Sequence, residues 1–181
     1  MSKLIEVKGK SQYDEDIKPS YRASACGPVT AFVLLRHLFP TQQTPTINDL
    51  YRQLGGTKIG LPTWRFVRRL GHLLGADWTV KVCHVHEAIQ QLDKGRPVAL
   101  KFDKWFRLKW CGRFSYDYHW VVMVGYEYVE DSLHVLVHDN GGRNRPSKVR
   151  SIPYQPNKKI LTFVKIEPSK RGNRKSLSSN Q

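Results

Sequence analysis

The chain of 181 residues carries 30 Lys and Arg against 15 Asp and Glu, a formal net charge of +15. This length fits one domain, a hydrophobic content of 40% suffices for a core, and the charge favours anionic partners. Three cysteines do not suggest a disulfide framework, and neither a signal peptide nor an apolar run long enough to span a membrane is present in the sequence. We therefore expect a cytoplasmic protein without a membrane span.

Helices are predicted in the first half of the chain, after a polar and extended segment over residues 1–25. The segment 28–38 begins with proline, which suits a first helical turn, and it is apolar on nearly every side, so we expect a buried helix. Three further helices are predicted over residues 44–56, 61–75 and 85–95. The first of these three has a capping box of Thr46 and Asp49, and Gly55 suits its C-terminal end.

The helix predicted over residues 61–75 has two contrasting faces. The apolar face holds Trp64, Val67, Leu70 and Leu74, and the basic face holds Arg65, Arg68 and Arg69. A basic face is usually only solvated, but it also suits an anionic partner. Residues 169–181 are basic and rich in serine, and we expect them to form a disordered tail.

Strands are predicted in the second half of the chain, which is rich in β-branched and aromatic residues. The predicted strands cover residues 97–103, 119–129, 133–139, 148–152 and 160–167. A short turn at residues 130–132 joins the second and third of them as a hairpin. Helices followed by antiparallel strands indicate the α+β class, with an N-terminal helical lobe packed on a C-terminal antiparallel β-sheet in one domain over residues 1–168.

Cys26 lies at the start of the predicted buried helix, followed by Gly27 and Pro28. A helix N-terminus stabilises a thiolate, which is the nucleophilic form of cysteine. A free cysteine is more often a small buried apolar residue, so Cys26 alone does not indicate catalysis.

His119 and Asp139 strengthen the catalytic interpretation. His119 begins one strand of the predicted hairpin, and Asp139 ends the other. Because the start of one antiparallel strand lies beside the end of its partner, we expect the two side chains at the same end of the sheet. An imidazole oriented by a carboxylate is the arrangement that nucleophilic catalysis requires.

Gln12 precedes Cys26 by 14 residues in a polar segment. A glutamine in such a segment is usually only solvated. Its side-chain amide, together with the backbone N–H of Cys26, would however supply two donors to an oxyanion.

These residues, in their order, resemble a known family. Gln12 is followed by ACGPVTAFVLL at residues 25–35, HWVVMVGYE at 119–127 and VLVHDNGG at 135–142. The series is similar to the C39-like branch of the papain-like cysteine peptidases. The resemblance implies the papain-like fold, hydrolysis of peptide bonds, a peptide or protein substrate, and no cofactor.

The resemblance also implies a role for each residue. Cys26 would be the nucleophile, His119 the general base and then acid, Asp139 the residue that orients His119, and Gln12 an oxyanion donor. The chain departs from the family pattern at Val29 and at Asn140, because Asp-Asn-Gly-Gly stands where Asp-Pro is more usual. Asn140 is therefore an alternative orienting residue. The leader-trimming members are attached to a transporter, so leader trimming is not implied for this short chain.

Two other classes of function stay open at this stage. One is an inactive papain-like binding module that holds an anionic partner on its basic surface, although retention of all four polar groups argues against it. The other is acyl transfer by the same Cys-His-Asp chemistry. Nucleic acid is an anionic partner that the residues favour less.

Three other clusters were weighed for function. Along a strand, His84 and His86 would share one face, but two ligands are too few for a structural zinc site, and no metal is predicted. His134 and His138 are interpreted as a partly exposed strand face. The aromatic and basic segment before His119 is interpreted as a wall of the substrate cleft, although the same composition also suits stacking of nucleic-acid bases or a set of core aromatics with solvated charges. It contains Lys104, Trp105, Phe106, Arg107, Lys109, Trp110, Arg113, Phe114, Tyr116 and Tyr118, and Cys111 within it is given no role.

Overall fold

The computed structural model describes residues 2–104, 114–143 and 145–169. The tail predicted for residues 169–181 lies outside this description except for Ser169, so its disorder stays a prediction. Much of the predicted cleft wall also lies outside it, namely Trp105, Phe106, Arg107, Lys109, Trp110, Cys111 and Arg113.

The described elements begin with helices and continue with strands, with one early strand and one strand between helices. In chain order they are β1 (Ser2–Leu4), α1 (Pro19–Arg22), α2 (Cys26–Leu38), α3 (Ile47–Leu54), α4 (Thr63–Leu74), β2 (Trp78–Cys83), α5 (Val85–Asp93), β3 (Val98–Asp103), β4 (Tyr118–Val129), β5 (Ser132–Asp139), β6 (Lys148–Pro153), α6 (Tyr154–Asn157) and β7 (Leu161–Pro168).

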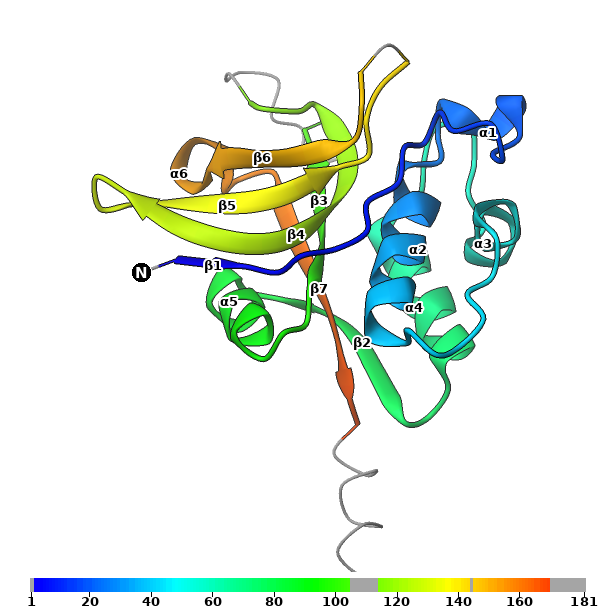
Figure 1. Ribbon diagram of the computed structural model, residues 1–181, viewed down its shortest axis with the longest axis horizontal. Helices are drawn as coiled ribbons and strands as arrows, with labels where there is room; N and C mark the ends of the chain where they lie inside the picture. The colour runs from blue at the N-terminus through cyan, green and yellow to red at the C-terminus, as the bar shows by residue number, and fades with distance from the viewer. Residues whose placement is uncertain (1, 105–113, 144, 170–181) are drawn as a thin grey trace, which may run out of the picture.

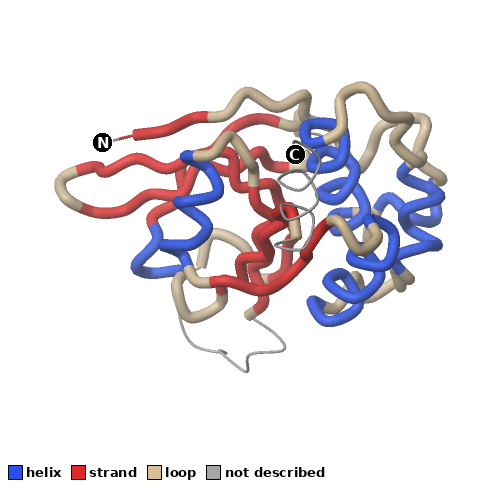
Figure 2. The backbone as a smooth tube through the Cα atoms, turned by 90° about the horizontal axis from the view of Figure 1, so that it is seen from below, coloured by secondary structure: helices blue, strands red, loops and turns tan. Residues whose placement is uncertain are grey.

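All strands belong to one antiparallel sheet with the order β2-β7-β3-β4-β5-β6, and β1 pairs with β4 beside this path. Helices α1 to α4 gather on one side of the sheet, as Figure 1 shows. The second view, in Figure 2, again shows a group of helices beside the strands of the sheet. The predicted α+β class, a helical lobe packed on an antiparallel sheet, is confirmed.

The central strands of the sheet are buried on both faces, which explains the nearly unbroken apolar run of β4. One face packs against α2, α3 and α4 through residues that include Trp120, Val122 and Val124. The opposite face holds Val121 and Met123 and is covered in part by α5. A strand with two buried faces needs no polar alternation.

The predicted helices are found with small shifts at their ends. Thr46 caps α3 by accepting a hydrogen bond from the Asp49 N–H at 3.1 Å, and Gly55 ends this helix with φ of 70°. Helix α2 is buried over most of its length, as its composition predicts, but it begins at Cys26 and not at Pro28.

Three local expectations were wrong. The segment 1–25 is not uniformly extended, because it contains β1 and α1. In α4, Trp64 is 60% exposed, and Phe66, which is fully buried, packs with Leu70 in its place. Strand β2 ends at Cys83, so His84 and His86 belong to the N-terminus of α5 and not to a strand.

No helix in the described part of the chain has both the length and the apolar character that crossing a membrane requires.

Candidate active site

Cys26 is the first residue of α2, where its side chain meets the start of β4. The residue is only 5% exposed, and Asn140 holds its backbone through a hydrogen bond from Nδ2 to the Cys26 carbonyl at 3.0 Å. The N-terminal end of α2 therefore presents a thiol from the helical lobe to the edge of the sheet.

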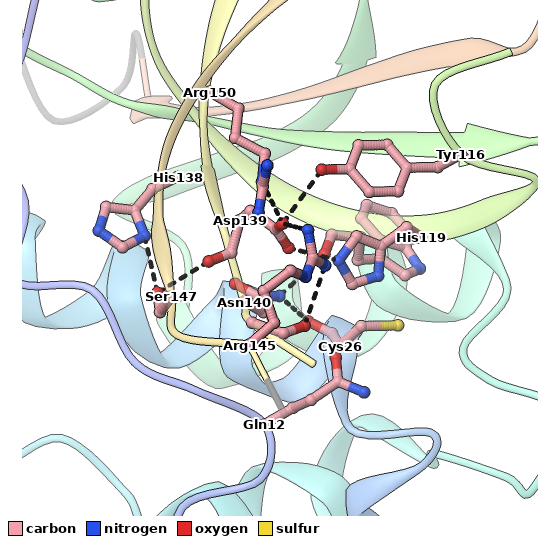
Figure 3. Close-up of polar contacts among 12 residues, drawn as sticks. Gln12, Cys26, Tyr116, His119, His138, Asp139, Asn140, Arg145, Ser147 and Arg150 are labelled. Atoms are coloured by element: carbon pink, nitrogen blue, oxygen red, sulfur yellow. Dashed lines mark hydrogen bonds and ion pairs between the residues drawn. The ribbon is translucent and has the colours of Figure 1, made fainter. Parts of the chain in front are cut away.

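The hairpin of β4 and β5 brings His119 to Asp139. Its turn consists of Glu130 and Asp131, both with positive φ, which is typical of a tight two-residue hairpin turn. The Nε2 atom of His119 lies 3.1 Å from Oδ1 of Asp139 (Figure 3). The hairpin argument from the sequence thus placed these two side chains correctly at one end of the sheet.

A β-bulge in β4 decides which face of the sheet Asp139 occupies. The register pairs Gly125 with Leu136 but Val122 with His138, so one extra residue of β4 lies between these pairs. Extending this register by one residue beyond the Val122–His138 pair would place Asp139 opposite Val121. Side chains alternate along a strand, so His119, two residues before Val121, lies on the same face of the sheet as Asp139. Without the shift, Asp139 would be opposite Val122 and on the other face.

The second oxygen of Asp139 is held by three donors that the sequence analysis did not identify. Oδ2 accepts from the Tyr116 hydroxyl at 3.1 Å and from Arg150 Nε at 2.7 Å, and it pairs with Arg145 Nη1 at 2.6 Å. The Tyr116 ring also lies 5.1 Å from the His119 ring. A carboxylate fixed from one side leaves its other oxygen directed at His119.

The charges of the site stabilise one another. Burial alone would raise the pKa of Cys26 and lower that of His119, but the contacts between them reverse both effects. The pKa of Cys26 lies below its usual value, because His119 and backbone N–H groups stabilise the thiolate. The pKa of His119 rises to about 9, because Asp139 and Cys26 stabilise the imidazolium. This combination favours a thiolate–imidazolium pair.

Asp139 is ionised throughout the physiological range. Burial would raise its pKa, but His119, Arg150 and Arg145 lower it to about 2. A carboxyl group with a lowered pKa stabilises the fold above its ordinary pKa near 4, and that contribution is lost as the pH falls towards 2. At neutral pH the carboxylate is available to hold the imidazolium.

Asn140 is engaged elsewhere. Its Nδ2 lies within hydrogen-bond distance of the carbonyls of Cys26 and Trp120 and of the Thr30 hydroxyl, at 2.8 to 3.1 Å. The residue is 1% exposed. It therefore ties α2 to β4, and the hydrogen bond to His119 belongs to Asp139.

Gln12 lies near Cys26 on the side away from Asp139 (Figure 3). Its backbone N–H donates to the Asn140 carbonyl at 2.9 Å, and its Nε2 donates to the Arg22 carbonyl at 2.9 Å. Its Oε1 is buried and has no hydrogen-bond partner within the described residues. Leaving a buried oxygen without a hydrogen-bond partner costs about 1–3 kcal/mol in stability.

A cleft of about 530 Å³ has Gln12, Cys26 and His119 in its wall. It is lined by Gln12, Ala23, Ser24, Cys26, Lys58, Ile59, Gly60, Tyr118 and His119. Tyr118 is thus the described part of the predicted cleft wall that does line the cleft. Phe114 instead packs against the core on the far face of the sheet.

The predicted basic face of α4 is partly used within the fold. Arg65 donates to the Gly55 carbonyl at 2.9 Å and Arg69 to the Gln53 carbonyl at 3.2 Å, so both side chains satisfy the C-terminal end of α3. Arg68 is exposed. Residues 2–104, 114–143 and 145–169 contain no group of three or more His, Cys, Asp or Glu side chains that could hold a metal ion.

Comparison with known proteins decides the family. A sequence model described as the Peptidase_C39 like family matches residues 4–166. The chain belongs to this family. The resemblance inferred from Gln12, Cys26, His119 and Asp139 is thereby confirmed at the level of the family. No curated protein matches the sequence significantly.

Solved structures share the fold of this family member. The peptidase domain of Streptococcus ComA, a bi-functional ABC transporter, has a TM-score of 0.53 at 13% identity, over 92% of this chain and 98% of that one. A double glycine motif protease from an AMS/PCAT transporter, in complex with the leader peptide, has a TM-score of 0.53 at 12% identity, over 92% of this chain and 95% of that one. UfSP from C. elegans has a TM-score of 0.59 at 11% identity, over 93% of this chain and 34% of that one. The family and the fold confirm the predicted class, a papain-like cysteine peptidase.

Proposed function

We propose that this C39-like peptidase hydrolyses peptide bonds with Cys26 as the nucleophile, His119 as the general base and acid, and Asp139 as the residue that orients His119. The observation that carries the proposal is the His119–Asp139 contact of 3.1 Å beside a buried thiol whose pKa is lowered. A buried cysteine with a purely structural role would have a raised pKa, as Cys83 has at about 11.

The reaction follows from the ion pair. The Cys26 thiolate attacks the carbonyl carbon of the peptide bond, and the electron pair of the carbonyl moves to its oxygen. Collapse of this intermediate breaks the C–N bond, and His119 gives its proton to the leaving amine. His119 then takes a proton from water as the water oxygen attacks the thioester, and cleavage of the C–S bond releases the Cys26 thiolate and the carboxylic acid, which loses its proton to solvent.

Gln12 is proposed as a donor to the oxyanion, together with the backbone N–H of Cys26. One proton of its Nε2 is directed at the Arg22 carbonyl, so the role falls to the second proton of the same nitrogen.

The proposal is tested by the rate at which iodoacetamide alkylates Cys26 as a function of pH, measured by peptide mass spectrometry. In the wild type we expect fast alkylation well below the ordinary thiol pKa of about 8.5. In His119→Ala the fast phase at low pH is lost, because the thiolate loses its imidazolium partner.

Gln12→Ala is the matched control for this experiment. It leaves the ion pair intact, so the alkylation profile is expected to stay unchanged, while hydrolysis of a peptide substrate slows about 10²–10³-fold. An alkylation rate equal to that of an ordinary thiol, and unaffected by His119→Ala, would overturn the catalytic pair and favour the inactive binding module. Consumption of an added amine in place of water would indicate acyl transfer.

A further inference from the structure

A tight turn over residues 57–60 stands at the mouth of the active-site cleft. Thr57 and Gly60 bind each other through both backbone N–H groups, at 3.1 and 2.9 Å, and the Thr57 hydroxyl donates to the Gly60 carbonyl at 2.8 Å. The two residues at its tip, Lys58 and Ile59, are exposed and line the cleft. Three hydrogen bonds in a turn of four residues make it a rigid support for the Lys58 side chain.

This turn is fixed to the catalytic strand. The Tyr118 hydroxyl accepts from the Leu61 N–H at 2.9 Å and lies 3.1 Å from the Leu61 carbonyl, and Tyr118 directly precedes His119. Gly60 has φ of 104°, and a Cβ atom there would lie 2.4 Å from the Tyr118 hydroxyl. Only glycine allows this approach, so the fold sets the position of the turn backbone that carries Lys58 relative to Tyr118 and its neighbour His119.

Lys58 introduces a positive charge into a cleft without a carboxylate. Among the described residues that line the cleft, Lys58 is the one lysine or arginine, and none is aspartate or glutamate. No hydrogen bond or ion pair within the described part of the chain occupies its ammonium group, in contrast to Lys104, which pairs with Asp117 at 3.1 Å. A positioned cation without an internal partner is suited to an anionic group of the substrate.

We propose that Lys58 is a specificity-determining residue that selects peptides with an aspartate or glutamate close to the scissile bond. The inference rests on the proposed function, because it assigns a substrate preference to the same cleft. Lys58 takes no part in bond making. Its expected effect is on KM, with kcat little changed, since the charge interaction is the same in the ground state and in the transition state.

The first experiment needs no substrate. The rate constants for alkylation of Cys26 by iodoacetate, which is anionic, and by iodoacetamide, which is neutral, are compared at low salt by peptide mass spectrometry. We expect the ratio of the two to fall about threefold to tenfold in Lys58→Met, as one partly screened charge implies, and to fall further in Lys58→Glu. Lys94→Met, at the exposed end of α5 and outside the cleft, is the matched control and keeps the wild-type ratio.

The second experiment identifies cleaved peptides in a mixed peptide library by mass spectrometry. The wild type is expected to enrich acidic residues at one position near the cleaved bond, Lys58→Met to lose this enrichment, and Lys58→Glu to prefer lysine or arginine there. A wild type that cleaves without acidic preference, or a preference that survives Lys58→Met, overturns the role of Lys58.

The two proposals fail in distinguishable ways. A Cys26 that reacts slowly with both reagents overturns the proposed catalytic function, and with it this inference. A reactive Cys26 whose reagent ratio is the same in wild type, Lys58→Met and Lys94→Met overturns the inference alone.

Discussion

Asp139 faces more positive charge than its proposed role towards His119 requires. Arg145 and Arg150 both bind Oδ2, with Tyr116 as a third donor, whereas a single imidazolium binds Oδ1. The two guanidinium groups hold the carboxylate in place, but they also compete electrostatically with the proton of His119. They therefore keep the pKa of His119 lower than an unshared Asp139 would set it.

Removing one of these charges should shift the pH dependence of the site. In Arg150→Gln the local potential becomes more negative, which raises both the pKa of His119 and the pKa of Cys26. The pH range in which Cys26 is a thiolate and His119 an imidazolium therefore moves upward, by about 0.3 to 1 pH unit. The alkylation rate of Cys26 as a function of pH, together with the pH profile of hydrolysis, measures this shift.

Two controls separate this charge effect from general damage. Arg150→Lys keeps the charge and should keep the wild-type profile. Arg68→Gln removes one charge from the exposed face of α4 and should leave the profile unchanged. A profile that does not move in Arg150→Gln would show that the arginine acts only on structure.

At the scale of the element, the β-bulge in β4 is the feature that places His119 and Asp139 on the same face of the sheet. Met123 and Tyr126 are three residues apart but contribute to the same core cluster, which a regular strand would not allow. The bulge lies where β1 pairs with β4: a Cβ atom on Gly125 would lie 2.1 Å from the Lys3 carbonyl oxygen. Glycine at this position allows β1 to pair and the register to shift.

Gly125→Ala is therefore expected to weaken a site to which this residue makes no contact. Because the new methyl group meets backbone and not a flexible side chain, β1 or the bulge has to move, at a cost of about 2 kcal/mol or more in the free energy of unfolding. Urea unfolding measures this cost, and the alkylation profile of Cys26 shows whether His119 keeps its partner.

Gly71→Ala is the matched control, since the new methyl group in α4 has no atom closer than 4.0 Å. It should stabilise the protein by about 0.5–1 kcal/mol. Equal stability of the two variants would contradict the packing argument at Gly125.

The same bulge shows how far the sequence can predict the site. Chain order alone placed His119 and Asp139 at one end of a hairpin, because that follows from antiparallel pairing. Their position on a common face of the sheet depends on one extra residue in β4, and no local sequence pattern predicted this bulge. Arg145 and Arg150 were missed because their contacts with Asp139 depend on the path of the chain after β5.

Helices and strands show a similar division. The capping box of Thr46 and Asp49 is local chemistry, and it was predicted correctly. The predicted buried face of α4 was wrong at Trp64. Phe66 is buried instead because its ring packs on that of Trp120, with centroids 4.5 Å apart, and such a tertiary contact cannot be inferred from the sequence of the helix alone. Strand β2 was not predicted, although its β-branched residues Thr79, Val80 and Val82 are typical of a strand.

At the scale of the whole molecule, β7 lies in the interior of the sheet although it is the last described strand. It pairs with β2 on one side and with β3 on the other, and Val164 and Ile166 enter the core beneath the helical lobe. Ser169 extends this pairing through its N–H, which donates to the Asp77 carbonyl at 2.7 Å. We therefore expect the domain to need the chain up to the end of β7.

Two truncations test this boundary. A protein that ends at Ser169 should keep its melting temperature within about 1–2 °C and keep the alkylation profile of Cys26, since it loses no described contact. A protein that ends at Asn157 should not fold cooperatively, because β2 and β3 lose the strand between them. Circular dichroism during heating measures both, and a large loss of stability in the longer variant would contradict a domain over residues 1–168.

The interior position of β7 also sets an order of events during synthesis. While the ribosome is still adding the residues of β7, the nascent chain already carries Cys26, His119 and Asp139, but β2 and β3 have no strand to join them. The helical lobe then has no complete sheet to pack against, because Val164 and Ile166 of β7 belong to the core beneath it. On the proposed function, the site would thus stay incomplete until β7 has been synthesised and has joined β2 and β3.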